Sequence, residues 1–168
     1  MPLSFLPKII AKSLTDLTPE LLRSRKIRLL MLDFDNTIVP YTTSVPTQEM
    51  ERWLDWVKHS GVQVCVVSNS HKERVKVFCR HYGIDCITHA RKPFSQGIRQ
   101  CLERYGIPAR HAALVGDQIF TDTLGANAQG VTSILVKAIH NHNILFKCRH
   151  VMELPFIAMA WKRKIENE

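Results

Sequence analysis

The sequence contains no apolar run long enough to cross a lipid bilayer. Its first residues lack the charged start and the small-residue cleavage site of a secretory signal. These two absences argue against a membrane-spanning or secreted protein. We therefore expect a cytoplasmic protein that is either soluble or peripheral at the inner membrane surface.

Paired cysteines are also missing from the sequence. The five cysteines form no Cys-x-x-Cys pair, and their odd number argues against a disulfide framework. Reduced thiols, as in most cytosolic proteins, are the expected state. The chain likewise has no internal repeat and no low-complexity tract.

Apolar residues and positive charge are abundant. The chain has 168 residues, 45% of them hydrophobic, which suits one globular domain with a substantial core. Its formal net charge of +8 and pI of about 9.5 indicate an anionic partner. Nucleic acid, an anionic membrane surface and a phosphorylated substrate all satisfy this condition, and charge alone does not choose among them.

The apolar run over residues 27–32 ends in two carboxylates, Asp33 and Asp35. Because the run shows no polar alternation, it predicts a strand covered on both faces, as in parallel sheets flanked by helices. Ligands of such sheets bind beyond the carboxyl ends of the strands, and side chains two apart point the same way. An ordinary turn, with Thr37 capping a helix, is the alternative interpretation.

Two carboxylates this close raise each other's pKa unless a proton or a cation intervenes. Oxygen ligands suit a hard divalent cation, so Asp33 and Asp35 predict a Mg²⁺ site.

The rest of the chain alternates between predicted strands and helices. Strands are expected over 62–67, 84–89, 112–115 and 132–136, and helices begin near 47, 70 and 93. This alternation is typical of a parallel sheet with helices on both faces. Polar residues follow the strands: Ser68, Lys92, Asp117 and Asp122. Ser70 starts a capping-box pattern, which places Ser68 beside a helix N-terminus where an anion binds readily.

The two ends of the chain allow different interpretations. Apolar residues over 1–17 have helical spacing, which fits either a helix lying on a membrane or a stripe that packs on the domain's own sheet. Residues 154–165 are amphipathic. The His-rich 139–150 stretch matches no metal-ligand spacing that we can defend, and we interpret His140, His142, Cys148 and His150 as part of a solvated basic loop. Cys86 and His89 are treated in the same way.

The order of these residue types resembles the haloacid-dehalogenase (HAD) superfamily of phosphohydrolases. The motifs Asp33-Phe34-Asp35-Asn36-Thr37, Val67-Ser68-Asn69, Ala90-Arg91-Lys92-Pro93 and Gly116-Asp117-Gln118-Ile119-Phe120-Thr121-Asp122 look like those of subclass III-A. Within it, the chain is similar to a small bacterial family related to eukaryotic phosphatidylglycerophosphate phosphatases. The resemblance spans roughly residues 27–136.

The resemblance implies an α/β fold: a Rossmann-like three-layer sandwich with a mainly parallel central sheet. The intervals 37–68 and 68–92 are too short for the cap domain that many relatives carry. We expect an N-terminal amphipathic segment and short helix over 1–26, a catalytic core over 27–136, and a basic extension with a helix over 137–168.

The resemblance also implies roles for individual residues. Asp33 would be the nucleophile and Asp35 the general acid and base, while Ser68 and Lys92 would bind the phosphoryl oxygens. Mg²⁺ would be held by Asp33, the Asp35 carbonyl and Asp117. Asp122 would orient Lys92 or a metal-bound water, with Thr37 and Asn69 in supporting positions.

The function expected from the sequence is Mg²⁺-dependent phosphomonoester hydrolysis through an aspartyl-phosphate, on phosphatidylglycerophosphate or a similarly bulky substrate. An uncapped site suits a lipid head group, and basic residues at both ends would hold the protein against anionic lipid: Lys8, Lys12, Lys162, Arg163 and Lys164. The alternatives are a phosphatase of nucleotides or nucleic-acid ends, and a catalytically inert binding protein with the same fold.

Overall fold

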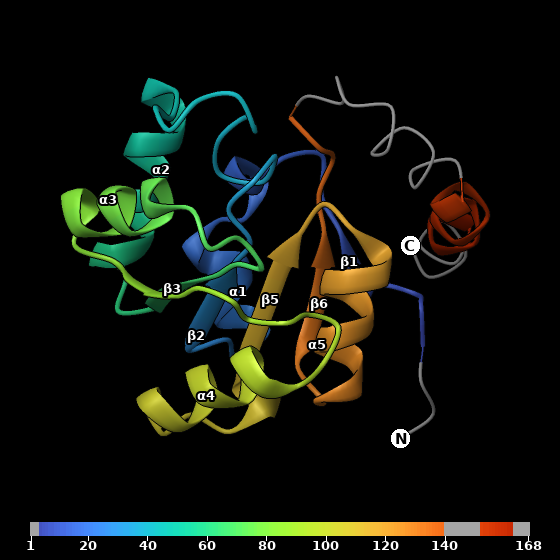
Figure 1. Cartoon of the computed structure of the whole chain (residues 1–168). Helices are drawn as coiled ribbons and strands as arrows, with labels where there is room; N and C mark the ends of the chain where they lie inside the picture. The colour runs from blue at the N-terminus through green and yellow to red at the C-terminus, as the bar shows by residue number, and fades with distance from the viewer. Residues whose placement is uncertain (1–3, 140–151, 163–168) are drawn as a thin grey trace.

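One parallel sheet organises the computed structural model, which describes residues 4–139 and 152–162 (Figure 1). The strand order is β1-β6-β5-β2-β3-β4, and every pair within these residues is parallel. The strands are β1 (Ile9–Ile10), β2 (Leu29–Leu32), β3 (Gln63–Val67), β4 (Asp85–Ile87), β5 (Ala112–Gly116) and β6 (Thr132–Leu135). The predicted parallel sheet is confirmed.

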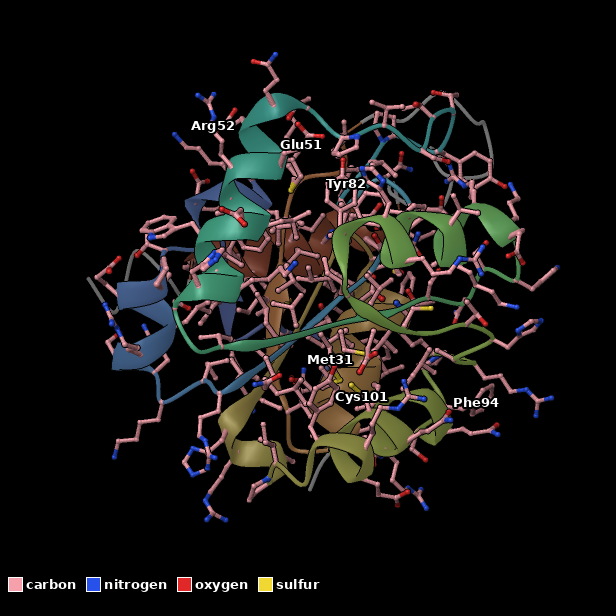
Figure 2. All side chains as sticks on the ribbon, turned by 90° about the vertical axis from the view of Figure 1, so that its left-hand side faces the viewer. Met31, Glu51, Arg52, Tyr82, Phe94 and Cys101 are labelled. Carbon is pink, nitrogen blue, oxygen red and sulfur yellow. The ribbon has the colours of Figure 1, made fainter. Side chains whose placement is uncertain are left out.

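Helices cover both faces of the sheet. They are α1 (Pro19–Ser24), α2 (Gln48–His59), α3 (Glu73–Tyr82), α4 (Gln96–Tyr105) and α5 (Leu124–Ala128). Alternate residues of β2 enter two separate cores: Leu30 belongs to the core under α2 and α3, and Met31 to the core under α4 and α5. Figure 2 shows Met31 beside Cys101 of α4 in the second core. The fold is the expected three-layer sandwich.

Local sequence explains how α2 and its neighbours begin and end. The Thr47 side chain accepts a hydrogen bond from the Met50 amide at 3.2 Å, which caps α2 where the sequence predicts it. The buried face of this helix consists of Met50, Trp53, Leu54 and Val57, which recur at helical spacing. Gly83 ends α3 at φ +59°, a left-handed conformation that costs glycine little.

Two predicted helix starts are wrong, both next to the site. Helix α3 begins at Glu73 rather than at Ser70, whose amide donates to Ser68 Oγ at 3.1 Å. Helix α4 begins at Gln96 rather than at Pro93. The side chain of Asn69 holds both backbone groups of Lys92, so the chain around Lys92 forms a loop and helix α4 begins only after it.

The described N-terminal residues do not form the helix that their apolar spacing predicts. Ile9 pairs with Ile134 in β1, a short 3₁₀ turn follows at Leu14–Asp16, and Leu14 and Leu17 are buried. The apolar stripe therefore packs on the domain's own sheet, which was one of the two interpretations. The short helix predicted after Thr18 is present as α1, capped by the Thr18 hydroxyl.

Residues 152–162 form a helix, close to the predicted amphipathic segment. His140, His142, Cys148, His150, Arg163 and Lys164 lie outside the described residues. Lys8 is exposed, and its ammonium donates a hydrogen bond to the Val131 carbonyl at 3.1 Å.

Within residues 4–139 and 152–162, no helix has the length and apolar character needed to cross a membrane. The chain between β2 and β3 holds a loop and α2, and the chain from β3 to Lys92 holds α3 and β4. Neither interval contains a cap domain, as predicted.

Candidate active site

The site lies at the carboxyl ends of the three central strands, β3, β2 and β5. The chain runs from β2 to β3 and β4 on one side, then returns to β5 and β6 on the other side of β2. Such a reversal opens a crevice at the strand ends, where ligands bind in parallel sheets. Asp33 follows β2, Ser68 follows β3 and Asp117 follows β5, so the topology brings these three predicted residues to one edge.

A buried ion-pair triad occupies the centre of this edge. Lys92 Nζ donates to Asp33 Oδ1 at 2.6 Å and lies 2.7 Å from Asp122 Oδ1. Burial alone would lower the pKa of Lys92, but the charges of Asp122 and Asp33 raise this pKa above its ordinary value. Lys92 is therefore a permanently charged ammonium in a low-dielectric setting.

Asn69 positions Lys92 from the neighbouring loop. The Lys92 amide donates to Asn69 Oδ1 at 2.7 Å, and Asn69 Nδ2 donates to the Lys92 carbonyl at 2.9 Å. This double hydrogen bond connects the loop after β3 to the loop after β4. It gives Asn69, predicted only as a supporting residue, a definite geometric relation to the ammonium.

The acidic groups outnumber this ammonium. Carboxylate oxygens of Asp33, Asp117 and Asp122 lie within 4.8 Å of one another. Burial raises the pKa of Asp33 to about 6, although the nearby Lys92 counteracts this rise. Burial, and then the charges of Asp33 and Asp122, raise the pKa of Asp117 well above its ordinary value.

These acidic groups fit a divalent cation with oxygen ligands. Asp117 Oδ1 is buried and has no hydrogen-bond partner among the residues that the structure describes. Three carboxylates facing one ammonium leave an excess of negative charge, which a divalent ion would balance. The cluster consists of Asp33, Asp117 and Asp122 and does not include the side chain of Asp35. The predicted metal contact of Asp35 concerns its carbonyl and stays a prediction.

The side chain of Asp35 instead contacts Arg74, in the first turn of α3. The Arg74 guanidinium also lies over the rings of Phe34 and Tyr41, with its central carbon 5.1 Å and 5.6 Å from the two ring centroids. Its Nη1 donates to the Thr43 carbonyl at 2.5 Å. Arg74 therefore joins α3, Asp35 and the loop after β2.

Sequence reasoning missed Arg74, and no motif could have identified it. The residue belongs to the polar face of an ordinary amphipathic helix, and its proximity to Asp35 depends on how α3 packs on the sheet, where Phe78 of α3 contacts Phe34 with ring centroids 5.2 Å apart. Thr37, a predicted supporting residue, is buried, and its hydroxyl has no hydrogen-bond partner within the described part of the chain.

A crevice of about 390 Å³ joins these groups, and it is lined by Asp33, Asp35, Ser68, Asn69 and Lys92 together with Tyr41, Ser70, His71, Lys72, Gln118 and Thr121. The sequence prediction omitted Tyr41, Lys72 and Gln118. Lys72 Nζ donates to the Tyr41 hydroxyl at 2.8 Å, so a second cation stands at the wall of the crevice. The arrangement places a carboxylate, cations and a hydroxyl around one small space. The cations and the hydroxyl can bind a phosphoryl group, and the carboxylate can attack it.

Two comparisons relate this site to known phosphatases. The profile of a family described as mitochondrial PGP phosphatase matches residues 1–139. The chain is also 34% identical over 132 residues to the probable phosphatase YqeG of Bacillus subtilis (strain 168), covering 79% of this chain and 77% of the relative.

Solved structures show the same fold at low identity. The chain is similar to the cobalt-bound deoxy-D-mannose-octulosonate 8-phosphate phosphatase of Haemophilus influenzae, with a TM-score of 0.54 and 14% identity over 67% of this chain and 69% of that one. A HAD-superfamily hydrolase of subfamily IA from Geobacter sulfurreducens gives a TM-score of 0.50 and 18% identity, over 68% of this chain and 92% of that one.

Proposed function

The chain belongs to the family described as mitochondrial PGP phosphatase, and from this premise we propose that it is a Mg²⁺-dependent hydrolase of phosphatidylglycerophosphate. That it is a HAD-type phosphatase follows from the family match and from the identity to YqeG. The lipid substrate and the identity of the metal are the proposed parts. One observation carries the chemistry: a buried carboxylate, Asp33, shares a small crevice with Lys92, and carboxylate oxygens of Asp33, Asp117 and Asp122 lie within 4.8 Å of one another.

Binding of the phosphoryl group is assigned to Ser68 and Lys92. The Ser68 hydroxyl and the Lys92 ammonium both line the crevice and are buried, so a phosphate oxygen would meet them without competing water. Asp122 contacts the ammonium, and Asn69 holds the backbone of Lys92. They act on the reaction through Lys92 and are positioning residues.

In the first half-reaction, a carboxylate oxygen of Asp33 attacks phosphorus and the bond from phosphorus to the leaving oxygen breaks. The protonated Asp35 carboxyl transfers its proton to that leaving oxygen, which departs as an alcohol. The product on the protein is an aspartyl-phosphate at Asp33.

In the second half-reaction, Asp35 accepts a proton from water while the water oxygen attacks the aspartyl-phosphate. The bond between Asp33 and the phosphoryl group breaks, inorganic phosphate leaves, and both carboxyl groups return to their starting states. Asp33 and Asp117 would hold Mg²⁺, with the Asp35 carbonyl as the further predicted ligand. When bound, the ion supplies positive charge that offsets repulsion between the attacking carboxylate and the phosphate.

The first experiment tests the chemistry on p-nitrophenyl phosphate. We expect turnover with Mg²⁺, loss of turnover with EDTA, and loss in Asp33→Asn. Asp35→Asn is expected to bind phosphate but to turn over roughly 10²–10⁴-fold more slowly, the usual contribution of general acid–base catalysis. Asp55→Asn, a change of an exposed carboxylate on α2, is the matched control and should retain full activity. Turnover that survives EDTA or Asp33→Asn would contradict the mechanism.

The second experiment tests the substrate. Phosphate release is compared for phosphatidylglycerophosphate in anionic vesicles, a 3′- or 5′-phosphorylated oligonucleotide and small sugar phosphates. We expect the highest kcat/KM for the lipid. A preference for the oligonucleotide, which the net charge of +8 would also attract, would overturn the lipid assignment and leave the phosphatase chemistry intact.

A further inference from the structure

A second hollow lies next to the catalytic crevice, at the β1 edge of the sheet. It has a volume of about 730 Å³ and is bounded by β1, β6, residues 136–139 and the helix over 152–162. Figure 1 shows this helix, in red, beyond the β1 and β6 edge. The lining is mainly apolar, with Ile10, Ala11, Leu135, Val136, Ile157 and Trp161 as its principal members. We call it the edge groove.

The edge groove is continuous with the catalytic site. Gln118 lines both the groove and the crevice, and Asp117 lines the groove from the proposed metal position. Lys12 and Lys137 also line the groove, are exposed, and are joined by a hydrogen bond from the Lys137 amide to the Lys12 carbonyl at 3.3 Å. A ligand that extends from the crevice past Gln118 would therefore enter a groove whose lining combines two cationic side chains with an apolar surface.

The outer wall of the groove is firmly attached to the site. Glu153 is buried, and its Oε1 accepts hydrogen bonds from the amides of Ile119 and Phe120 at 3.0 Å and 3.3 Å. Phe156 packs against Phe120 and Phe5, with ring centroids 6.0 Å and 5.1 Å apart. These contacts fasten the helix over 152–162 to the loop that carries Asp117 and Asp122. The family match ends at residue 139, so this wall lies beyond the matched part of the chain.

We propose that the edge groove binds an acyl chain of a lipid phosphomonoester whose phosphate lies in the catalytic crevice. The inference rests on the proposed function and adds to it the place where the lipid portion is bound. Three chemical parts of such a substrate match three groups of side chains. The phosphomonoester would bind Lys92, an internal phosphodiester would contact Lys12 and Lys137, and the acyl chain would pack on the apolar lining.

The size and chemistry of the groove favour this ligand. Its volume falls within the roughly 300–1,000 Å³ of pockets that bury small ligands. Sugar phosphates carry no apolar part that would gain from a surface of isoleucine, leucine and tryptophan side chains. An acyl chain gains up to about fourfold in binding for each methylene that it buries, which corresponds to about 0.8 kcal/mol.

A chain-length series tests the proposal with substrates that share one head group. Deacylated glycerophosphoglycerol phosphate, dibutanoyl phosphatidylglycerophosphate and dihexanoyl phosphatidylglycerophosphate are compared as monomers, below the micelle concentration. We expect kcat/KM to rise with chain length, by at least about tenfold from the deacylated compound to the dihexanoyl lipid. Equal kcat/KM for all three would overturn the proposal.

Variants of the groove then locate the effect. We expect Trp161→Ala and Ile157→Asp to lower the ratio of kcat/KM for the dihexanoyl lipid to that for the deacylated compound by about tenfold. Trp161 is 38% exposed, so its variant keeps the test valid if Ile157→Asp does not fold. Ala158→Asp is the matched control, because Ala158 lies on the same helix, is exposed and is outside the lining. A ratio unchanged in both groove variants would contradict the assignment.

A binding measurement separates failure of this inference from failure of the proposed function. Calorimetry with dihexanoyl phosphatidylglycerol, the expected product, requires no turnover. Binding that weakens about tenfold in Trp161→Ala supports the groove even if no phosphomonoester is hydrolysed. Turnover of p-nitrophenyl phosphate without any binding of the dihexanoyl product would remove the groove proposal and leave the phosphatase chemistry in place.

Discussion

At the scale of single residues, the crevice concentrates negative charge that the fold alone does not neutralise. Asp33, Asp117 and Asp122 share one buried space with the ammonium of Lys92. Like charges held together out of water destabilise the folded state, and they also provide a strong cation site. The same residues therefore lower stability in the metal-free protein and supply the chemistry of the reaction.

This charge distribution makes the stability of the metal-free protein depend on pH. The folded pKa of Asp33 is raised from 3.8 to about 6, and a raised carboxyl pKa means that the folded state binds the proton more tightly than the unfolded state. Its stabilising contribution is complete below about pH 4 and is lost as pH rises through 6. The loss attributable to Asp33 is on the order of 3 kcal/mol.

Thermal unfolding in EDTA at pH 5 and pH 7.5 checks this expectation, with Asp117→Asn as the informative variant. Because the pKa of Asp117 is raised in the same direction, removing its charge should increase the metal-free Tm at pH 7.5 by about 2–4 °C for each kcal/mol recovered. The variant should also lose most of the Tm increase that Mg²⁺ gives the wild type. A metal-free Tm that is independent of pH in both proteins would show that the buried carboxylates are neutralised in another way.

Arg74 gives a second expectation at this scale. Its guanidinium contacts Asp35 and donates to the Thr43 carbonyl, so it fixes the side chain proposed to carry the proton. We expect Arg74→Ala to lower kcat by at least about tenfold, part of the 10²–10⁴-fold contribution of general acid–base catalysis, with a smaller change in KM. Arg74→Lys should recover only part of the rate, because an ammonium lacks the planar fork that reaches both partners.

A purely structural role for Arg74 predicts a different result. In that case Arg74→Ala would lower Tm while kcat stays near the wild-type value. Steady-state kinetics at saturating Mg²⁺, measured alongside thermal unfolding, distinguishes the two roles.

At the scale of elements, the loops that follow β3 and β4 are shaped by each other. Asn69 connects them through two hydrogen bonds to the backbone of Lys92, and the helices α3 and α4 begin only after the residues that meet in the crevice. The two loops together position the ammonium of Lys92. A substitution that disturbs either loop should therefore lower the rate of the reaction.

Asn69→Ala tests this coupling against Thr47→Ala, a change of the α2 cap. Each variant should lose about 1–2 kcal/mol of stability, the first through two hydrogen bonds and the second through a cap. Only Asn69→Ala should also lower kcat/KM on p-nitrophenyl phosphate, because Thr47 lies at the start of α2 and supports no residue of the crevice. Denaturant unfolding and kinetics on both variants provide the comparison. Equal activity in the two would show that Lys92 holds its position without Asn69.

At the scale of the whole molecule, charge and exposed apolar surface suggest how the enzyme meets a lipid. The chain carries a net charge of +8, and the helix over 152–162 exposes Met152, Leu154 and Met159 beside Lys162. We propose peripheral contact with anionic membranes through this helix, with each basic residue near the surface contributing about 1 kcal/mol. Of the basic residues first considered, Lys8 donates a hydrogen bond to the Val131 carbonyl, and its contact with a membrane stays a prediction.

Vesicle sedimentation tests the membrane contact directly. We expect the protein to sediment with anionic vesicles at low salt, to be released near 0.5 M salt because the surface charges are screened, and to remain in solution with neutral vesicles. Lys162→Glu together with Met159→Asp should weaken sedimentation, whereas Glu20→Gln, on the exposed surface of α1, should not. Failure of the wild type to sediment at low salt would exclude the contact and leave the edge groove to be tested with monomeric lipid.

The sequence by itself determined the α/β architecture and most of the site, because both depend on local patterns. Unbroken apolar runs specified buried parallel strands, and the buried face and cap of α2 followed from helical periodicity and Thr47. Asp33, Ser68 and Asp117 stand directly after β2, β3 and β5, and parallel strands bring their ends to one edge. Local pattern failed at the N-terminus, where helical spacing in residues 4–17 gave way to strand β1 because the sheet offered an edge to pair with.

Only the tertiary structure decided the contacts between residues that no motif relates. Arg74 reaches Asp35 because α3 packs on the sheet with Phe78 against Phe34, and Glu153 reaches the Ile119 amide because the last described helix lies against the sheet edge. Ile10, Leu135 and Trp161 form one apolar surface for the same reason. These contacts depend on how whole helices and strands are placed relative to one another. Packing of the buried core fixes that placement, and the spacing of residues along the chain does not predict it.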